Sequence, residues 1–324
     1  MSLKAIALVS GGLDSALAAK IIKLQGVEVI GIAFITPFTC PETKSLAQSI
    51  GIQIHPHEVS LEYLDLLRNP RFGFGKNLNP CIDCHIFMLK KARELMSGYK
   101  ADFIVSGEVL GQRPMSQNSA SLKKIEKESG LDGLLIRPLS ARLLPETMVE
   151  RNGWVKRNLL YGFSGRSRKP QMELVKKIGL QGFGQPAGGC LLTDAGFSQR
   201  LKDLLNYQRE LNLDDIQLLK LGRHFRLNRT AKLIVGRNQQ ENQRLINFAN
   251  TGKIILRPKE VPGPTAILDT KDAGKELLDL SAGIVARYCD RKNGSVRISV
   301  DDGRNSRVIN STALEPDNLE ALRV

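Results

Sequence analysis

A short glycine-rich segment near the start of the chain has the residue types of an anion-binding turn. Residues 10–15 read SGGLDS, after an apolar stretch at 3–9 that predicts a buried strand and before a stretch at 16–25 that predicts a helix. A glycine-rich turn at a helix N-terminus directs backbone N–H groups and the positive end of the helix dipole at an anion. Gly11 and Gly12 carry no Cβ atom, so a phosphate can approach their backbone closely.

The polar side chains of this turn fit the same interpretation. Ser10 and Ser15 carry hydroxyls that can donate to phosphate oxygens. Asp14 cannot contact a phosphate without a cation between them, so it indicates either a bound Mg²⁺ or a structural role at the helix start. The spacing differs from that of the other phosphate loop, which requires GxxxxGKS/T.

Two cysteines in the middle of the chain have the spacing of a metal or sulfur site. Cys81 and Cys84 follow Asn79 and Pro80, which predict the start of a helix that runs to about Gly98. Residues three apart share a helix face, and a helix N-terminus favours thiolate over thiol. A CxxC alone is consistent with a zinc half-site, a redox pair or an iron–sulfur half-site.

One of the remaining three cysteines lies in glycine-rich surroundings. Cys190 ends the segment QPAGGC at 185–190, where glycines allow the backbone to approach a ligand closely. No second CxxC completes a zinc-ribbon pattern. Cys40 and Cys289 have unremarkable neighbours and are predicted to be packing thiols.

The elements around these residues predict an α/β fold with a parallel sheet. Strands are expected at 27–35, 52–59 and 102–107, with a short helix at 41–50. Strands and helices in alternation imply right-handed crossovers and parallel pairing. Ligands bind at the carboxyl ends of strands in such sheets, where the turn at 10–15 is placed.

The turn resembles the PP-loop (SGGxDS) of ATP pyrophosphatases, which split ATP between its α and β phosphates and adenylate a substrate. With Cys84 in the segment NPCIDC and the lone Cys190, the chain resembles the tRNA thiouridine synthetase branch of that family. Bacterial members carry a sulfur-handling cysteine in NPDxxCN and a second cysteine far downstream. Cys81 and His85 depart from that segment, and Cys81 is similar to the CxxC of cluster-dependent tRNA thiolases.

This resemblance implies ATP, Mg²⁺ and a 4Fe-4S cluster as cofactors. The cluster would bind Cys81, Cys84 and Cys190 and leave its fourth iron open to sulfide. The alternative is a persulfide mechanism without metal, in which Cys84 and Cys190 react as a pair. Under either mechanism, Cys84, Cys190 and Asp14 are the predicted catalytic residues, and the ATP phosphates would bind at Ser10 and its neighbours Gly11, Gly12, Asp14 and Ser15.

The loop that leaves the strand at 102–107 is the second predicted part of the nucleotide site. Similar enzymes carry a glycine and polar groups at this place. Gly107 would admit the adenylate, Gln112 would hydrogen-bond to it and Arg113 would neutralise phosphate. The alternative is a loop that only caps the sheet.

Composition and charge restrict the class of protein. A hydrophobic content of 42% and a charged content of 25% over 324 residues predict a globular protein of two domains. No apolar run is long enough for a membrane span, and the N-terminus leads straight into the first strand without room for a signal peptide. We therefore expect a cytoplasmic protein with reduced thiols and no membrane partner.

The positive charge is unevenly distributed. The net charge is +14, and residues 151–230 hold 15 Lys and Arg against 6 Asp and Glu. Such a segment is suited to phosphate-backbone contacts, although a solvated basic face is the common alternative. Arg137, in the segment IRPL, is expected to face RNA or phosphate or to be a surface arginine. The predicted backbone-binding loop at 154–169 contains Lys156, Arg157, Arg166, Arg168 and Lys169.

The pattern predicts two domains. Residues 1–210 form the predicted PP-loop domain and residues 211–324 a smaller α+β domain. In the second domain, VGRN at 235–238 and VPGP at 261–264 are similar to the NFACT-R type of RNA-associated domain.

The predicted function is an ATP-dependent tRNA sulfurtransferase that adenylates a uridine carbonyl and replaces its oxygen by sulfur. Its partners would be tRNA and a sulfur donor, either sulfide or a persulfide-carrying desulfurase, and a homodimer is compatible with this prediction. The alternatives are a PP-loop amidating or ligating enzyme that acts on a small molecule and a non-catalytic RNA-binding factor. An intact SGGLDS argues against the latter.

Overall fold

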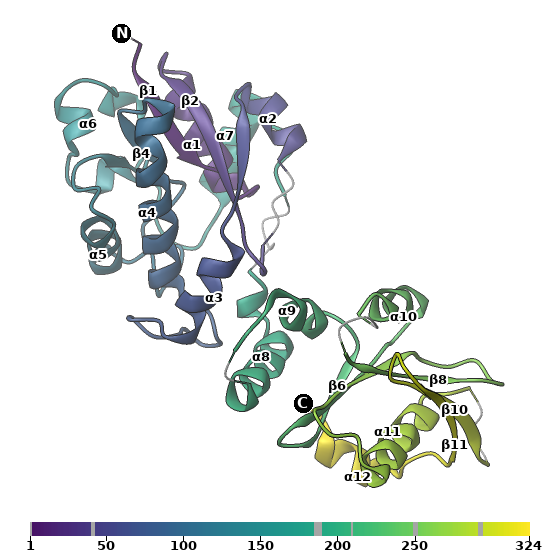
Figure 1. The fold of residues 1–324 in the computed structure, drawn as a ribbon. Helices are drawn as coiled ribbons and strands as arrows, with labels where there is room; N and C mark the ends of the chain where they lie inside the picture. The colour runs from purple at the N-terminus through teal and green to yellow at the C-terminus, as the bar shows by residue number, and fades with distance from the viewer. Residues whose placement is uncertain (1, 40–42, 185–189, 209, 249–251, 291–293) are drawn as a thin grey trace. The chain divides into compact units, whose positions relative to one another are not determined.

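The computed structural model divides the chain into two compact units, Met1–Asp194 and Ala195–Val324 (Figure 1). It describes residues 2–39, 43–184, 190–208, 210–248, 252–290 and 294–324. Cys40 and the segment 185–189, both considered in the sequence analysis, lie outside the described residues.

The first unit is built on a parallel sheet of five strands. The strands are β1 (Lys4–Leu8), β2 (Glu28–Ile35), β3 (Ile54–Glu58), β4 (Phe103–Val105) and β5 (Leu135–Ile136). Their order is β3-β2-β1-β4-β5, and each neighbouring pair is parallel. The predicted α/β class is therefore confirmed. The chain moves from β1 to one side and later returns to the other side, so a topological switch point lies between β1 and β4, where open α/β sheets bind ligands.

Helices cover both faces of this sheet because its buried strands are apolar on both sides. Ala5 and Ala7 pack with α1 (Leu13–Lys23), α2 (Lys44–Ile50) and α7 (Lys169–Ile178). Ile6 faces the other way and packs with α4 (Cys81–Tyr99) and α5 (Ser119–Ser129). The shorter helices α3 (Ser60–Arg68) and α6 (Met148–Arg151) complete the unit. Alternate residues of β1 thus fix the helices that carry the turn at 10–15 and the CxxC on opposite faces of one sheet.

Helix α4 begins one residue later than its sequence predicts. Pro80 is its N-cap, and no side chain caps it by a hydrogen bond. The Asn79 side chain instead accepts from the backbone N–H of Asn77 at 3.2 Å and donates to the Cys81 sulfur at 3.1 Å. Cys81 therefore stands at the first helical position, and Asn79 contacts the thiol that it was expected only to precede.

The second unit is an antiparallel sheet with helices, which confirms the predicted α+β domain. Its strand order is β11-β10-β8-β9-β7-β6. The strands are β6 (Arg223–Asn228), β7 (Ala231–Val235), β8 (Ile254–Pro258), β9 (Ala266–Asp269), β10 (Val296–Asp301) and β11 (Ser306–Ser311). The helices are α8 (Ala195–Tyr207), α9 (Leu213–Leu219), α10 (Gln239–Ile246), α11 (Lys275–Arg287) and α12 (Pro316–Leu322). None of the helices in the described residues is long and apolar enough to cross a membrane.

The division into compact units places helix α8 in the second unit, whereas the sequence predicts a boundary after residue 210. The reason is a set of charged contacts that the local sequence does not reveal. Asp203 of α8 accepts from Arg226 of β6 and from Lys232 of β7, each at 2.8 Å. These ion pairs join α8 to the antiparallel sheet.

Candidate active site

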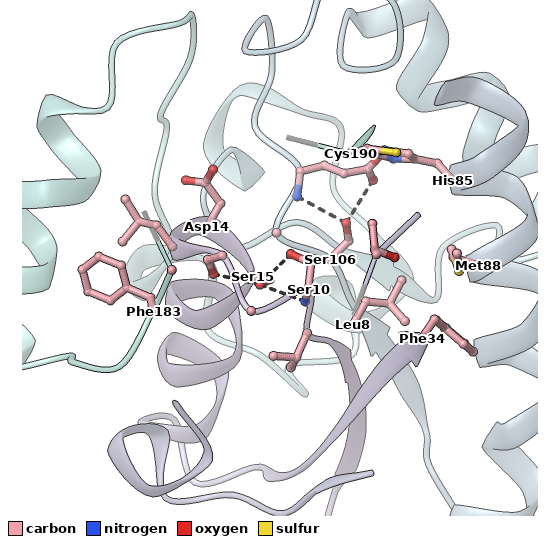
Figure 2. Close-up of a pocket in the computed structure, with 18 of the residues that line it drawn as sticks. Leu8, Ser10, Asp14, Ser15, Phe34, His85, Met88, Ser106, Phe183 and Cys190 are labelled. Carbon is pink, nitrogen blue, oxygen red and sulfur yellow. Dashed lines mark hydrogen bonds and ion pairs between the residues drawn. The ribbon is translucent and has the colours of Figure 1, made fainter. Parts of the chain in front are cut away.

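A cavity of ≈ 730 Å³ lies at the carboxyl ends of β1 and β4 in the first unit (Figure 2). The whole segment Leu8–Ser15 lines it, and so do Gly107 and Arg113. Cys84 and Cys190 also line this cavity. The structure thus brings the predicted anion-binding turn and two of the three predicted sulfur ligands to one cavity, at the switch point where the topology places a ligand site.

Hydrogen bonds of the Ser10 and Ser15 hydroxyls stabilise the turn at 10–15. Gly11 adopts a φ of 77°, a left-handed conformation that glycine tolerates without strain, and Gly12 is the N-cap of α1. The Ser15 hydroxyl donates to the Gly12 carbonyl at 2.9 Å and accepts from the Ser10 N–H at 3.2 Å. The two serine hydroxyls lie 3.2 Å apart (Figure 2). The first turn of α1 therefore presents its N-terminus to the cavity, where it favours an anion.

Gly107 makes room for this turn. A Cβ at position 107 would lie 2.5 Å from the backbone N of Ser15 and 2.7 Å from the carbonyl carbon of Asp14. Backbone atoms cannot move aside as the end of a flexible side chain can. The loop after β4 and the start of α1 approach this closely only because residue 107 is a glycine, which adds a packing role to the one that the sequence predicts.

Asp14 is held by two side chains from distant loops. Gln112 Nε2 donates to Asp14 Oδ2 at 2.8 Å, and Arg168 Nη2 lies 3.8 Å from the same oxygen. Asp14 Oδ1 is buried without a hydrogen-bond partner among the described residues. Gln112 is not part of the cavity wall, so its amide positions Asp14 in this structure. Arg168, which the sequence placed in an RNA-binding loop, lines the cavity.

The cysteines are close enough to influence one another electrostatically. Burial raises the pKa of the Cys84 thiol to about 12, and the charges of Cys190 and Cys81 add to this effect. A hydrogen bond from Tyr63 and the charge of Arg113 act in the opposite direction on the Cys84 pKa. Burial also raises the pKa of Cys190. The expectation that the helix N-terminus would favour thiolate is therefore wrong for Cys84, because loss of solvation outweighs the helix dipole.

The three cysteines do not form a metal-binding group as they stand. Among the described residues, no three His, Cys, Asp or Glu side chains are placed to hold a metal ion. Iron binds thiolate sulfur, but the three cysteine side chains are not grouped around one metal position among the described residues. Cys289 is buried in the second unit, as expected of a packing thiol, and burial raises its pKa to about 11.

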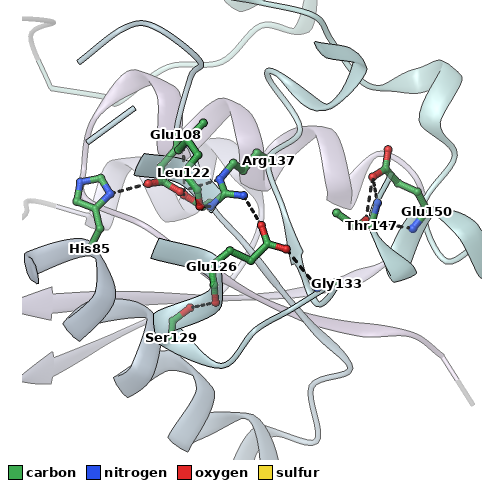
Figure 3. A network of polar contacts seen from close by, with 10 residues as sticks. His85, Glu108, Leu122, Glu126, Ser129, Gly133, Arg137, Thr147 and Glu150 are labelled. Carbon is green, nitrogen blue, oxygen red and sulfur yellow. Dashed lines mark hydrogen bonds and ion pairs between the residues drawn. The ribbon is translucent and has the colours of Figure 1, made fainter. Parts of the chain in front are cut away.

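Arg137 is buried and forms ion pairs, which corrects the expectation that it faces RNA, phosphate or solvent. Its Nε donates to Glu108 Oε2 at 2.9 Å and its Nη1 to Glu126 Oε2 at 2.7 Å (Figure 3). Glu108 also bonds to His85. Sequence reasoning missed this network because its members are separated along the chain and none is apolar or glycine-rich.

The predicted backbone-binding loop at 154–169 is only partly available to a partner. Arg157 pairs with Glu150 and Glu146 of the same unit, and Arg168 reaches Asp14. Arg166 and Lys169 are exposed. The basic character that the sequence indicates is thus divided among internal ion pairs, the cavity and the surface.

Two family models match the chain, one in each unit. The model described as thiamine biosynthesis protein (ThiI) matches residues 1–142, and the model described as NFACT protein RNA binding domain matches residues 222–323. The parallel sheet with a glycine turn at its carboxyl edge is the fold that the PP-loop resemblance predicts. The two matches, each over less than half of the chain, confirm both predicted resemblances.

The curated relatives match about two fifths of the chain. A probable tRNA sulfurtransferase of Ureaplasma urealyticum serovar 10 is 31% identical over 143 residues, 42% of this chain and 36% of the relative. A tRNA-specific 2-thiouridylase MnmA of Karelsulcia muelleri is 30% identical over 138 residues, 38% of this chain and 35% of the relative. The chain spans about a third of the length of these relatives. A solved 4-thiouridine synthetase–RNA complex with bound ATP is 22% identical, with a TM-score of 0.42 over 67% of this chain and 52% of that chain.

Proposed function

We propose that the protein is an ATP-dependent tRNA sulfurtransferase that converts a uridine carbonyl to a thiocarbonyl. The observation that carries this proposal is the shared cavity, because the PP-loop, Cys84 and Cys190 all line it. An adenylating enzyme without sulfur chemistry has no need for two cysteines beside its nucleotide turn. The relatives named as tRNA sulfurtransferase and 2-thiouridylase support the same class of reaction.

The PP-loop would bind the phosphates of ATP. Backbone N–H groups of Gly11 and Gly12 and the N-terminus of α1 would contact the phosphate oxygens. Arg113 and Arg168, which line the cavity, would offset the phosphate charge. Asp14 Oδ1, buried without a hydrogen-bond partner among the described residues, fits one ligand position of Mg²⁺. Bound Mg²⁺ would neutralise charge on the phosphates, while Gln112 keeps the Asp14 carboxylate in place.

The first half of the reaction activates the base. The uridine carbonyl oxygen attacks the α-phosphorus, a new P–O bond forms, and the bond to the β-phosphate breaks to release pyrophosphate. The carbonyl oxygen then leaves as part of AMP when sulfur attacks the same carbon. Gly107 would let the adenylate lie against the backbone at the end of β4.

The second half delivers sulfur through the thiols. A persulfide on one of the pair Cys84 and Cys190 attacks the activated carbon, a C–S bond forms, and the C–O bond to AMP breaks. The other thiol then attacks the inner sulfur, so a disulfide forms and the thiocarbonyl is released. An external dithiol reduces the disulfide. We derive no step from the predicted 4Fe-4S cluster, because Cys81, Cys84 and Cys190 do not form a metal-binding group here; the iron content of anaerobically purified protein tests it.

The partners and the compartment are further parts of the proposal. The exposed Arg166 and Lys169 and the NFACT-type domain would bind the tRNA backbone. A persulfide-carrying desulfurase would supply sulfur to the thiol pair. Sulfide, the other donor that the sequence suggests, would first need a two-electron oxidation to form a persulfide. The chain would act in the cytoplasm, as a monomer or a homodimer. Reduced thiols at Cys84 and Cys190 suit that compartment.

A reconstituted assay tests the proposal. Purified protein is incubated anaerobically with ATP, Mg²⁺, a persulfide-forming desulfurase with its cysteine substrate, a dithiol and unmodified tRNA, and the nucleosides are identified by mass spectrometry. We expect thiouridine together with AMP and pyrophosphate from the native chain and from the control Cys289→Ala. Cys84→Ala and Cys190→Ala should release pyrophosphate but form no thiouridine. Thiouridine at the native rate from Cys190→Ala would refute the sulfur role, and no pyrophosphate release with tRNA would refute the whole function.

A further inference from the structure

The loop that joins α3 to α4, residues 69–80, carries an exposed aromatic side chain that the proposed reaction does not use (Figure 1). Phe74 is 39% exposed and stands between Gly73 and Gly75. A single exposed apolar side chain is common on protein surfaces. The ring is therefore of interest only if the loop holds it in place and its surroundings suit one kind of ligand.

A buried carboxylate attaches the first half of this loop to α4. Asp83, which is 8% exposed, accepts from the backbone N–H groups of Arg71 and Phe72, each at 3.0 Å. The Phe72 ring packs against the core between α4 and the sheet. The backbone directly before Phe74 is therefore fixed, and the exposed ring stands on an anchored segment.

The second half of the loop contacts both segments that carry the predicted sulfur ligands. Asn77 Nδ2 donates to the backbone carbonyl of Thr193 at 2.6 Å, three residues after Cys190. Asn79 Nδ2 donates to the Cys81 sulfur at 3.1 Å. The loop thus holds its exposed ring at a fixed place beside the thiols.

Cations lie around the same loop. Arg71 and Lys76 on the loop and Lys124 on α5 are exposed, and the Lys124 ammonium lies 4.7 Å from the centroid of the Phe72 ring. Arg71 pairs with Glu128 at 2.6 Å, whereas Lys76 and Lys124 form no ion pair within the described part of the chain. An exposed ring among cations is the combination by which proteins hold single-stranded nucleic acid, with bases stacked on the ring and phosphates beside the charges.

The proposed reaction needs such a strand. The carbon that receives sulfur must meet Cys84 and Cys190 in the cavity that they line, and a base stacked inside a helix cannot reach them. When one base leaves its stack, the next base loses a stacking partner. An aromatic ring held beside the thiols can take the place of that partner.

We propose that the loop at 71–77 is a contact surface for single-stranded RNA, in which Phe74 stacks on a base next to the target uridine and Lys76 contacts a flanking phosphate. This inference rests on the proposed function, which makes RNA the substrate. A protein that delivers persulfide must also reach the thiols. The cations of the loop and the net charge of +14 favour RNA as the occupant.

Binding of unmodified tRNA to the full chain tests the stacking. Phe74→Ala should raise the Kd for tRNA about tenfold and lower kcat/KM for tRNA by a similar factor, while the Kd for ATP stays unchanged. Phe74→Tyr retains a ring and should bind tRNA as the native chain does. The matched control Leu24→Ala removes an apolar side chain that is 64% exposed at the far end of α1 from the turn at 10–15, and should change none of these values. Native tRNA affinity in Phe74→Ala, or equal losses in Phe74→Ala and Phe74→Tyr, would overturn the inference.

A fluorescent variant reports the contact itself. Phe74→Trp adds a surface indole to a chain whose single tryptophan, Trp154, is half-buried. We expect single-stranded RNA to quench the added fluorescence and a duplex of equal length to quench it much less. Lys76→Ala should lower the slope of log Kd against log salt by about 1. Quenching by a persulfide-forming desulfurase and not by RNA would assign the loop to the sulfur donor and refute the RNA surface.

The failure of this inference differs from the failure of the proposed function. If Phe74→Ala weakens tRNA binding but the native chain forms no thiouridine, the function is refuted and the RNA surface stands. If Phe74→Ala binds tRNA and forms thiouridine as the native chain does, the function stands and the RNA surface is refuted.

Discussion

At the scale of single residues, Gly107 is the position where the candidate site tolerates least change. A methyl group there would lie within 2.7 Å of the backbone at Asp14 and Ser15. We predict that Gly107→Ala destabilises the first unit by about 2 kcal/mol or more and weakens ATP binding, because the loop and the start of α1 must separate. Chemical denaturation and titration with ATP measure the two effects.

Gly98 provides the matched control for that prediction. It lies in the last turn of α4, and no heavy atom lies within 4 Å of a Cβ built there. Gly98→Ala should therefore not destabilise the protein, should stabilise it by at most about 1 kcal/mol through its helix propensity, and should leave ATP binding unchanged. Equal destabilisation by both substitutions would contradict the close packing of Gly107 against the turn at 10–15.

Glu108 gives the protein a predictable response to acid. Burial opposes its charge, yet Arg137 and His85 hold its pKa at about 2, below the ordinary 4.5. Because the unfolded chain takes up this proton more readily, the stabilisation by Glu108 is complete above pH 4.5 and is lost as the pH falls towards 2. We predict that the free energy of unfolding falls less steeply over this window in Glu108→Gln than in the native chain, as measured by denaturant titration at each pH. Identical slopes would exclude the ionised Glu108.

The residues that local sequence could identify are those with a distinctive type or spacing. SGGLDS and the CxxC at residues 81–84 indicate an anion turn and a sulfur site, and Cys190 was expected to join them. Tyr63 was missed, because it reaches Cys84 through a tertiary contact and no pattern near it distinguishes it from an ordinary core residue. Glu108 lies in the predicted loop but was not singled out, and Arg168 was assigned to RNA binding and not to the cavity.

At the scale of elements, α8 tests where the second unit begins. Its Asp203 is the partner of Lys232, whose side chain is only 7% exposed, and of Arg226. Asp203→Ala would leave a buried ammonium group without its counter-ion, so we predict a loss of about 3 kcal/mol in the free energy of unfolding of the second unit. The control Glu260→Ala removes a pair with Arg297 in which both side chains are 52% exposed, and should cost at most about 1 kcal/mol.

A fragment comparison extends this prediction to the boundary. Residues 195–324 should unfold cooperatively, while residues 211–324, which lack α8, should be less stable by a similar amount. Equal stability of the two fragments would place the boundary where the sequence predicted it.

The parallel sheet could be derived from sequence because its strands are continuous apolar runs joined by helices. The antiparallel sheet was only partly predictable. β6 reads RHFRLN and β11 reads SRVINS, and neither has an apolar alternation clear enough to distinguish a strand from a polar loop. The edge strand β11 is largely exposed. Its residues therefore need not be apolar, and its sequence lacks the apolar alternation that would predict a strand.

At the scale of the whole molecule, the net charge of +14 predicts how the proposed interaction with RNA depends on salt. We predict that tRNA binding weakens steeply as salt rises, because each phosphate contact releases counter-ions. The double variant Arg166→Ala, Lys169→Ala removes two exposed cations and should lower the slope of log Kd against log salt by about 2 without a change in ATP affinity. Filter binding at several salt concentrations measures this slope, and an unchanged slope would exclude the loop at 154–169 as the contact.

The proposed sulfur transfer requires that nucleotide and thiols share one cavity, and protection of thiols by ATP measures this most directly. The reduced protein is treated with an alkylating reagent with and without ATP and Mg²⁺, and the labelling rate of each cysteine is followed by mass spectrometry. We predict that ATP slows labelling of Cys84 and Cys190, which line the cavity with the PP-loop, and leaves Cys289 unaffected. If saturating ATP changes the rate at neither Cys84 nor Cys190, the nucleotide and the thiols do not share a site, and the proposed transfer of sulfur to an adenylated base is contradicted.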